Sequence, residues 1–350
     1  MSASIYVTSY HINVKVGDAA IHLVIKGSGG QEEILRAVLI DGGSSKRNAI
    51  LGKDNALKRM IDRLSTLYGT VLAFDTIVIS HWDEDHYGGL VDLLRADMKR
   101  AVETSVQPSK VLTYLKWKTE NNEEVPETYM YCPNEAGKGV NGLPESFRRG
   151  PEPTTGIFVQ VCTDDDPSKD KGSWRSFARL RSAEKTGDLY TVLGANFFTN
   201  TELPNNPGKI TPAELVAKNP PPLGWPGMYC IGVKNTTFEM NKPPRIIREG
   251  VTKTNQWSIT CVILWPNAGS PPKCSHYSAG DADELRESTY MEWLQAGGIA
   301  GMTNMKLSHH GSRSSTPLTS NQLSPVNIII SNPTGLYFHP GQCRAPHQTQ

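Results

Sequence analysis

Apolar and polar residues alternate along most of the first forty positions of the chain. Residues 5–26 place apolar side chains at nearly every second position, with a turn signal at Gly17-Asp18. This pattern predicts a β-hairpin, because alternate side chains of a strand lie on opposite faces. The apolar run 34–40 stops at Asp41-Gly42-Gly43, which predicts a strand followed by a sharp turn.

The spacing then changes to that of a helix. From Asp54 to Gly69 apolar residues recur mostly every three or four positions, which predicts an amphipathic helix that covers one face of a sheet. The β-branched run 74–80 predicts a buried strand, and helical spacing resumes over 88–94. Alternating strands and helices are typical of α/β proteins, whose active sites favour the ends of strands.

Polar, proline-rich sequence fills residues 101–250. We expect an inserted subdomain or a set of elaborated loops there, because so long an irregular segment is unusual within one compact domain. Strand and helix patterns return later, at 258–265, 282–294, 305–307 and 326–330. The chain is therefore predicted to form one domain from residues 1–100 and 251–345, with 101–250 inserted.

Composition excludes several classes of protein. The 350 residues include 36 basic and 35 acidic side chains, a net charge of +1, so no field of the whole chain attracts nucleic acid or an anionic membrane. Apolar runs fall far short of the roughly 20 residues that cross a bilayer, and the N-terminus lacks a secretory pattern. We expect a cytoplasmic protein without a membrane span. Its six cysteines include no Cys-x-x-Cys pair and are expected to be mostly buried thiols.

The densest chemical signal directly follows the predicted strand at 74–80. Four potential metal ligands fall within six residues there, namely His81, Asp83, Asp85 and His86. Two imidazoles and two carboxylates in a tight turn supply nitrogen and oxygen donors suited to divalent metal ions. A solvated acidic turn with incidental histidines is the alternative interpretation.

Further candidate ligands follow later apolar runs. None of the nine histidines lies between 87 and 275. His309-His310 comes after the run 305–307, His339 also follows a strand-like run, and Asp281 follows another. Strand ends at one edge of a sheet are where such side chains meet.

Together these motifs resemble the metallo-β-lactamase fold, and most closely the soluble domain attached to the DNA-uptake channel ComEC. The family motif His-x-Asp-x-Asp-His is met by residues 81–86, while Gly17-Asp18-Ala19 and Asp41-Gly42-Gly43 resemble its two upstream motifs. The later motifs also appear in the family's order, at 255–258, Gly280-Asp281, His309-His310 and His339-Pro340. The resemblance spans residues 10–98 and 253–340 and implies an α/β fold, an αββα sandwich with a long insertion.

Roles for these residues follow from the same resemblance. One divalent ion would be held by Asp85, His86 and a late histidine, which is His339 or one of His309 and His310. A second ion would be held by His81 and Asp83, and Asp281 would bridge the two. Asp18 and Asp41 would orient the ligands without binding metal. Catalysis would involve Asp85, His309 and His310, with the histidine that binds no metal protonating the leaving oxygen.

The donor set departs from the usual pattern of the fold. Asp83 stands where a second imidazole is usual, and a further histidine before Gly280-Asp281 has no clear counterpart. Carboxylate in place of imidazole moves the preference toward a harder ion such as manganese, although zinc is the usual occupant of the fold. One or two divalent ions, zinc or manganese, are therefore expected.

The resemblance implies a metal-dependent hydrolase, which we expect to be a phosphodiesterase or nuclease that uses a metal-activated water. A hydrolase of small esters, lactones or cyclic phosphates is one alternative, and a non-catalytic metal-binding interaction module is another. Residues 169–185 carry six basic side chains interleaved with Trp174 and Phe177, which could track phosphates and stack bases. A solvated helix with two core aromatics is the alternative explanation of the same pattern. Nucleic acid is therefore a possible substrate, and protein partners are unknown.

Overall fold

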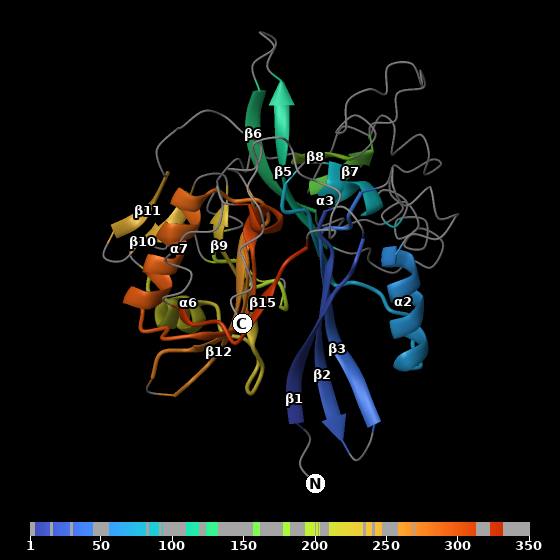
Figure 1. Cartoon of the computed structure of the whole chain (residues 1–350), viewed down its shortest axis with the longest axis horizontal. Coiled ribbons are helices and arrows are strands. Elements are labelled where there is room, and N and C mark those ends of the chain that lie inside the picture. Colours follow the sequence, from blue (N-terminus) through green and yellow to red (C-terminus); the bar gives the residue numbers. More distant parts are fainter. Residues whose placement is uncertain are drawn as a thin grey trace.

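Two mixed β-sheets lie face to face in the computed structural model, with helices on their outer faces (Figure 1). This is the αββα arrangement that the sequence predicts. The structure describes residues 4–14, 17–28, 31–44, 56–81, 84–90, 93, 110–118, 124–131, 157–161, 178–182, 193–199, 201, 203, 210–233, 236–239, 242–246, 258–268, 270–312 and 323–331.

The first sheet contains the strands β1 to β6 in sequential order. Their bounds are Ser4–His11, Ala20–Ser28, Gln31–Ile40, Thr76–Val78, Lys110–Lys118 and Glu124–Tyr131. β1, β2 and β3 are antiparallel, β3, β4 and β5 are parallel, and β6 returns antiparallel to β5. The hairpin predicted within 5–26 and the strand predicted at 34–40 are confirmed.

The second sheet has the order β11-β10-β9-β12-β13-β14-β15. In chain order these strands are β9 (Gly227–Val233), β10 (Thr236–Glu239), β11 (Lys242–Ile246), β12 (Thr260–Trp265), β13 (Lys273–Ser278), β14 (Met302–Lys306) and β15 (Asn327–Ile329). Only β13, β14 and β15 run parallel. Two further strands, β7 (Ile157–Val161) and β8 (Ala178–Ser182), pair with each other.

The helices cover the outer faces, with α2 on the first sheet and α6 and α7 beside the second (Figure 1). The helical segments are α2 (Ala56–Leu67), α3 (Glu84–Tyr87), η2 (Gly88–Leu90), α6 (Pro212–Lys218), α7 (Glu284–Ala296) and η4 (Ser308–Gly311). The helices predicted between Asp54 and Gly69 and over 282–294 are confirmed. Of the helix expected over 88–94, residues 88–90 form the 3₁₀ turn η2 directly after α3, residue 93 is helical, and residues 91, 92 and 94 lie outside the described residues.

Alternate residues of the first sheet enter two separate cores. Leu23 and Leu39 pack toward α2, where Leu57 and Leu64 are fully buried. Val24, the next residue along β2, packs instead toward the second sheet. This is the period of two expected for a sheet that is covered on both faces.

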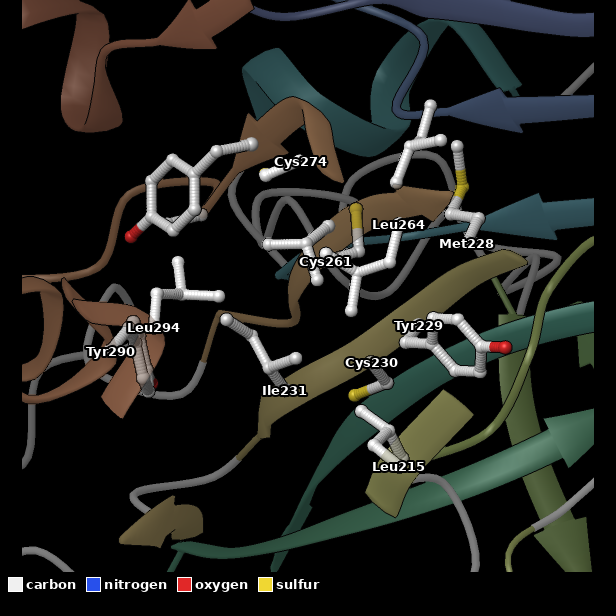
Figure 2. Packing of buried hydrophobic residues seen from close by; sticks show 14 of the residues in the cluster. Leu215, Met228, Tyr229, Cys230, Ile231, Cys261, Leu264, Cys274, Tyr290 and Leu294 are labelled. Carbon is white, nitrogen blue, oxygen red and sulfur yellow. The ribbon is translucent and has the colours of Figure 1, made fainter. Parts of the chain in front are cut away.

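The larger core lies between the sheets and continues under α7. Figure 2 shows Ile231 of β9 beside Leu294 of α7, and Leu215 of α6 beside Cys230. Trp293 is also buried, and its indole N–H donates to the carbonyl of Ile210 at 2.7 Å. Its ring stacks on Phe238 with ring centres 5.4 Å apart. The second sheet and α7 therefore form one packed unit.

Strands from the segment 101–250 pair with both sheets. β5 and β6 extend the first sheet, and β9 lies next to β12 in the second. The division of the chain into 1–100 with 251–345 and an inserted 101–250 stays a prediction, and the pairing shows that this segment contributes to the sandwich itself.

The described cysteines Cys230, Cys261 and Cys274 are free thiols buried in the core. Burial raises the pKa of Cys230 to about 12, so the thiol stays neutral. Among the described helices, none is both long and apolar enough to cross a bilayer.

Candidate metal centre

Strand ends from both sheets bring a group of polar side chains together. They come from the loop before β2 (Asp18), the end of β3 (Asp41), the end of β4 (Ser80, His81), α3 (Asp85, His86), the turn after β13 (Asp281), the end of β14 (Lys306) and η4 (His309, His310). Most of these side chains are buried. The arrangement follows from the parallel strands, whose carboxyl ends share one edge of a sheet.

Backbone contacts hold these loops against one another. Asp18 N donates to Asp85 O at 3.2 Å, and Gly42 N donates to His86 O at 2.6 Å. Gly17 makes the first contact possible, because a Cβ atom at this residue would lie 1.5 Å from Asp85 O. Its φ of +87° also lies in the region that favours glycine. The Gly-Asp turn therefore allows the loop before β2 to touch α3.

The Asp281 carboxylate lies at the centre of the cluster, with four imidazoles around it. Its Oδ1 is 3.3 Å from His86 Nε2, and its Oδ2 is 3.5 Å from His81 Nε2. The Nε2 atoms of His309 and His310 each lie 3.8 Å from Oδ2. Donor atoms bound to one tetrahedral zinc ion are about 3.3 Å apart, so these spacings match those of ligands that share ions.

His310 links this centre to two more carboxylates. Its Nε2 lies 3.3 Å from Asp85 Oδ2, and its Nδ1 lies 3.6 Å from Asp18 Oδ1. Asp18, His86, Asp281 and His310 each offer a donor atom within 4.8 Å of the other three. Asp18, expected to orient ligands only, thus stands among the possible ligands themselves, where it also pairs with Lys306.

Asp41 orients the His86 ring through Nδ1, the ring nitrogen that does not face Asp281. Ser80 donates to the Asp41 carboxylate through its backbone N–H at 2.7 Å and through its hydroxyl at 2.6 Å. His86 Nδ1 lies 2.8 Å from Asp41 Oδ2, and because a carboxylate only accepts, Nδ1 carries the proton. His86 Nε2 faces Asp281 and is therefore the nitrogen available to bind a metal ion, as in many metal-binding histidines.

Asp41→Asn is expected to weaken metal affinity by about 10- to 100-fold without abolishing binding, because it removes a partner that orients a ligand and not the ligand. Competition with a chromophoric chelator measures the affinity. Asp75→Asn is the matched control, since the Asp75 carboxylate accepts from Ala37 N in the first sheet. An affinity unchanged in Asp41→Asn, or lowered equally in Asp75→Asn, would contradict the role of Asp41.

The electrostatics of the cluster favour added positive charge. Burial by itself would lower the pKa of His310, but Asp281 and Asp18 raise it to about 10. The pKa of His86 is likewise raised well above its ordinary value, against the effect of burial, by Asp281 and Asp41. Four aspartates, Asp18, Asp41, Asp85 and Asp281, thus share the cluster with these imidazoles, and the Lys306 ammonium pairs with Asp18.

A divalent metal ion fits these residues. His86 Nε2 and Asp281 Oδ1 are buried without a hydrogen-bond partner, whereas buried polar atoms are normally satisfied. The field that favours protons on His86 and His310 equally attracts a dication. The donors are carboxylate oxygens and imidazole nitrogens, which suit zinc and harder ions of the manganese type.

The turn that carries the two adjacent histidines is held by Glu287 of α7. His309 and His310 have φ values of +47° and +56°, which are unusual for residues other than glycine. Ser308, the residue before them, donates from its hydroxyl to Glu287 Oε1 at 2.6 Å, and Tyr277 donates to the same oxygen at 3.2 Å. Burial raises the pKa of Glu287 to about 8, although these hydroxyls and Lys306 oppose the shift.

Glu287→Gln is expected to reduce the pH dependence of stability between about pH 4.5 and 8. In the folded protein the pKa of Glu287 is raised, so its stabilising contribution is fully present below the unfolded pKa and is lost as pH rises through about 8. The slope is at most about 1.4 kcal/mol per pH unit. Urea unfolding of metal-free protein at pH 5 and pH 8 measures the difference, and equal slopes in both proteins would contradict it.

The structure brings together eight of the residues selected from the sequence, namely Asp18, Asp41, His81, Asp85, His86, Asp281, His309 and His310. Asp83 and His339 lie outside the described residues. Sequence reasoning missed Lys306, Ser80 and Glu287. For Lys306 a signal was present, because a charge inside the apolar run 305–307 is uncommon for a buried strand.

Fold and donor cluster together define the class of protein, a metal-dependent hydrolase built on an αββα sandwich. The family model described as the metallo-beta-lactamase superfamily matches residues 36–175, which include the motif at 81–86. Over these residues the chain is similar to the metallo-β-lactamase superfamily domain. No curated protein sequence and no solved structure gives a significant match to the chain, and the closer resemblance to the ComEC-type domain stays a prediction.

Proposed function

We propose that this protein is a metal-dependent phosphodiesterase, with DNA or RNA as its substrate. The Asp281 carboxylate, surrounded by four imidazoles and joined through His310 to Asp85 and Asp18, carries the proposal. This donor set is richer in oxygen than a set of imidazoles alone and favours hard ions, which also bind phosphate oxygens well.

For the proposed reaction, divalent ions would be bound by the cluster described above, namely Asp281, His81, His86, His310 and the nearby carboxylates. Bound divalent metal supplies an activated water and neutralises negative charge on the reacting phosphate. Asp41 fixes the tautomer of His86. The site therefore has its ligands positioned before substrate arrives, which lowers the cost of reorganisation during the reaction.

His309 is assigned to proton transfer and His310 to metal binding. The His309 side chain is 28% exposed and can reach a substrate, whereas His310 belongs to the four-residue donor group. Burial lowers the pKa of His309, although Asp281 opposes this, so the imidazole is largely neutral near pH 7. It can then accept a proton at Nε2 and pass it to the leaving oxygen.

His309→Gln is expected to slow cleavage of DNA by about 10²-fold and to slow cleavage of bis(p-nitrophenyl) phosphate far less. The p-nitrophenolate group leaves without a proton, whereas the alkoxide of DNA needs one. Steady-state rates on both substrates at saturating metal measure the contrast. Equal losses on the two substrates would assign His309 to metal binding or to structure.

A substrate panel tests the proposed function as a whole. Purified protein is freed of metal with a chelator, reloaded with Zn²⁺ or Mn²⁺, and incubated with single-stranded DNA, bis(p-nitrophenyl) phosphate and p-nitrophenyl acetate. Metal-dependent cleavage of DNA supports the proposal. Turnover of small esters alone would favour a small-molecule hydrolase, and metal binding without turnover would favour a non-catalytic module.

A further inference from the structure

Three histidines form a second cluster between the two sheets, made of residues different from those of the metal centre. They are His11 at the end of β1, His22 on β2 and His276 on β13. Their ring centres are 6.0 Å apart for His11 and His22, 5.2 Å for His11 and His276, and 4.7 Å for His22 and His276. Each ring is thus a neighbour of the other two.

Strand register explains why the rings meet. His22 lies opposite Ser9, and His11 lies opposite Ala20. Directly opposite residues share a face of the sheet, as do residues two positions apart, so Ser9, His11 and His22 lie on one face. Val24 extends this face and packs in the core toward the second sheet, where β13 supplies His276.

Four ring nitrogens of this cluster make no hydrogen bond. His22 and His276 are 0% and 1% exposed, yet His22 Nε2 and both ring nitrogens of His276 make no hydrogen bond. His11 Nε2 is also buried without a partner. Buried polar atoms are nearly always hydrogen-bonded or bound to an ion. Three such imidazoles side by side therefore indicate a missing ligand.

The spacing of the rings fits a metal ion. Nitrogens about 2.0 to 2.1 Å from one zinc ion, at tetrahedral angles, place the ring centres of neighbouring imidazoles about 5 Å apart. The three observed separations lie around this value. We propose that His11, His22 and His276 form a second metal site, which takes a divalent transition ion of the zinc type and links the two sheets.

Binding requires the rings to turn. Among the described residues, only the group of the metal centre brings donor atoms from at least three side chains within 4.8 Å of one another, so the three nitrogens must rotate toward a common point. The His22 ring is already positioned for this, because its Nδ1 lies 2.8 Å from Ser9 Oγ and its Nε2 is left for the ion. Such a hydrogen bond behind the ligand is usual in zinc sites.

The chemistry of the surroundings also suits a metal. Burial lowers the pKa of His11 to about 4 and of His22 to about 3, and it lowers that of His276 well below its ordinary value. Neutral imidazoles are the form that binds metal. Lys306 and Asp18 act on His11 in opposite directions, and as an ion pair they add no net charge. This inference is independent of the proposed phosphodiesterase activity.

Metal counting in the full-length protein tests the second site. A His86→Ala/Asp281→Asn variant disables the metal centre, and it is titrated with Zn²⁺ and Co²⁺ after chelator treatment. Equilibrium dialysis with elemental analysis measures bound metal, and the visible absorption of Co²⁺ reports tetrahedral coordination. We expect this variant to keep about one bound equivalent, and addition of His22→Gln to remove it.

Two further variants separate metal binding from folding. Cys274→Ala changes a buried side chain two residues from His276 without removing an imidazole, and it should keep the bound equivalent. Should His22→Gln fail to fold by circular dichroism, His11→Gln replaces it, because His11 is only partly buried at the end of its strand. No bound metal in the His86→Ala/Asp281→Asn variant, or a folded histidine variant that retains the equivalent, would overturn the proposal.

Discussion

Asp281→Asn is expected to lower metal-dependent hydrolysis by at least about 10³-fold, equivalent to about 4 kcal/mol of transition-state stabilisation. The substitution preserves the shape of the side chain but removes the charge that lies among His81, His86, His309 and His310. Binding of divalent metal should weaken as well, because an amide oxygen is a much poorer ligand than a carboxylate. Initial rates and bound metal per chain, measured on the same preparation, check both effects.

A second readout does not depend on activity. In metal-free protein Asp281 raises the pKa of both His86 and His310, so Asp281→Asn should lower both values, as seen in histidine ring signals followed by NMR against pH. Asp75→Asn is the matched control, since the Asp75 carboxylate accepts from Ala37 N in the first sheet, away from the metal centre. A full complement of metal and activity in Asp281→Asn would show that the carboxylate is not a ligand.

Strands and helices of the sandwich were predictable from the sequence wherever the spacing of apolar residues was typical of one kind of element. Residues 34–40 form an almost continuous apolar run because both faces of β3 are covered there, and α2 shows helical spacing because only one of its faces is covered. β13 was missed, because its sequence Lys-Cys-Ser-His-Tyr-Ser has no apolar alternation, although its inner residues are buried. β9 was missed because glycine and proline surround its apolar residues, and its burial comes from its position between β10 and β12.

Local motifs predicted much of the candidate site, because the ligand groups at 81–86 and 309–310 each follow a strand that the apolar pattern predicts. Relations between distant strands were not predictable. The pairing of Asp18 with Lys306 joins the loop before β2 to the end of β14, and no spacing in the chain reports that contact. His11, His22 and His276 were visible as single histidines, but only the packing of β2 against β13 makes them neighbours.

Lys306→Met is expected to destabilise the metal-free protein by about 3 to 5 kcal/mol, because it leaves a buried carboxylate without its cation. Lys306 and Asp18 are 4% exposed each, and they form a direct ion pair. Burial raises the pKa of Asp18, but Lys306 and His310 outweigh this and hold it well below its usual range. Urea unfolding in the presence of a chelator measures the free energy of unfolding.

Three further measurements would identify the loss of the Asp18–Lys306 ion pair as the cause of the lower free energy of unfolding. Bound divalent metal should reduce the deficit of Lys306→Met, since it restores positive charge beside Asp18. Lowering the pH should also reduce it, because in the variant only His310 and His86 still lower the pKa of Asp18, so protonation removes the charge that lost its partner at a higher pH than in the unchanged protein. The double variant Asp18→Leu/Lys306→Met should recover part of the lost stability, because neither charge is left buried alone. A deficit below about 1 kcal/mol, or one independent of pH and metal, would mean that Lys306 stabilises the site through packing alone.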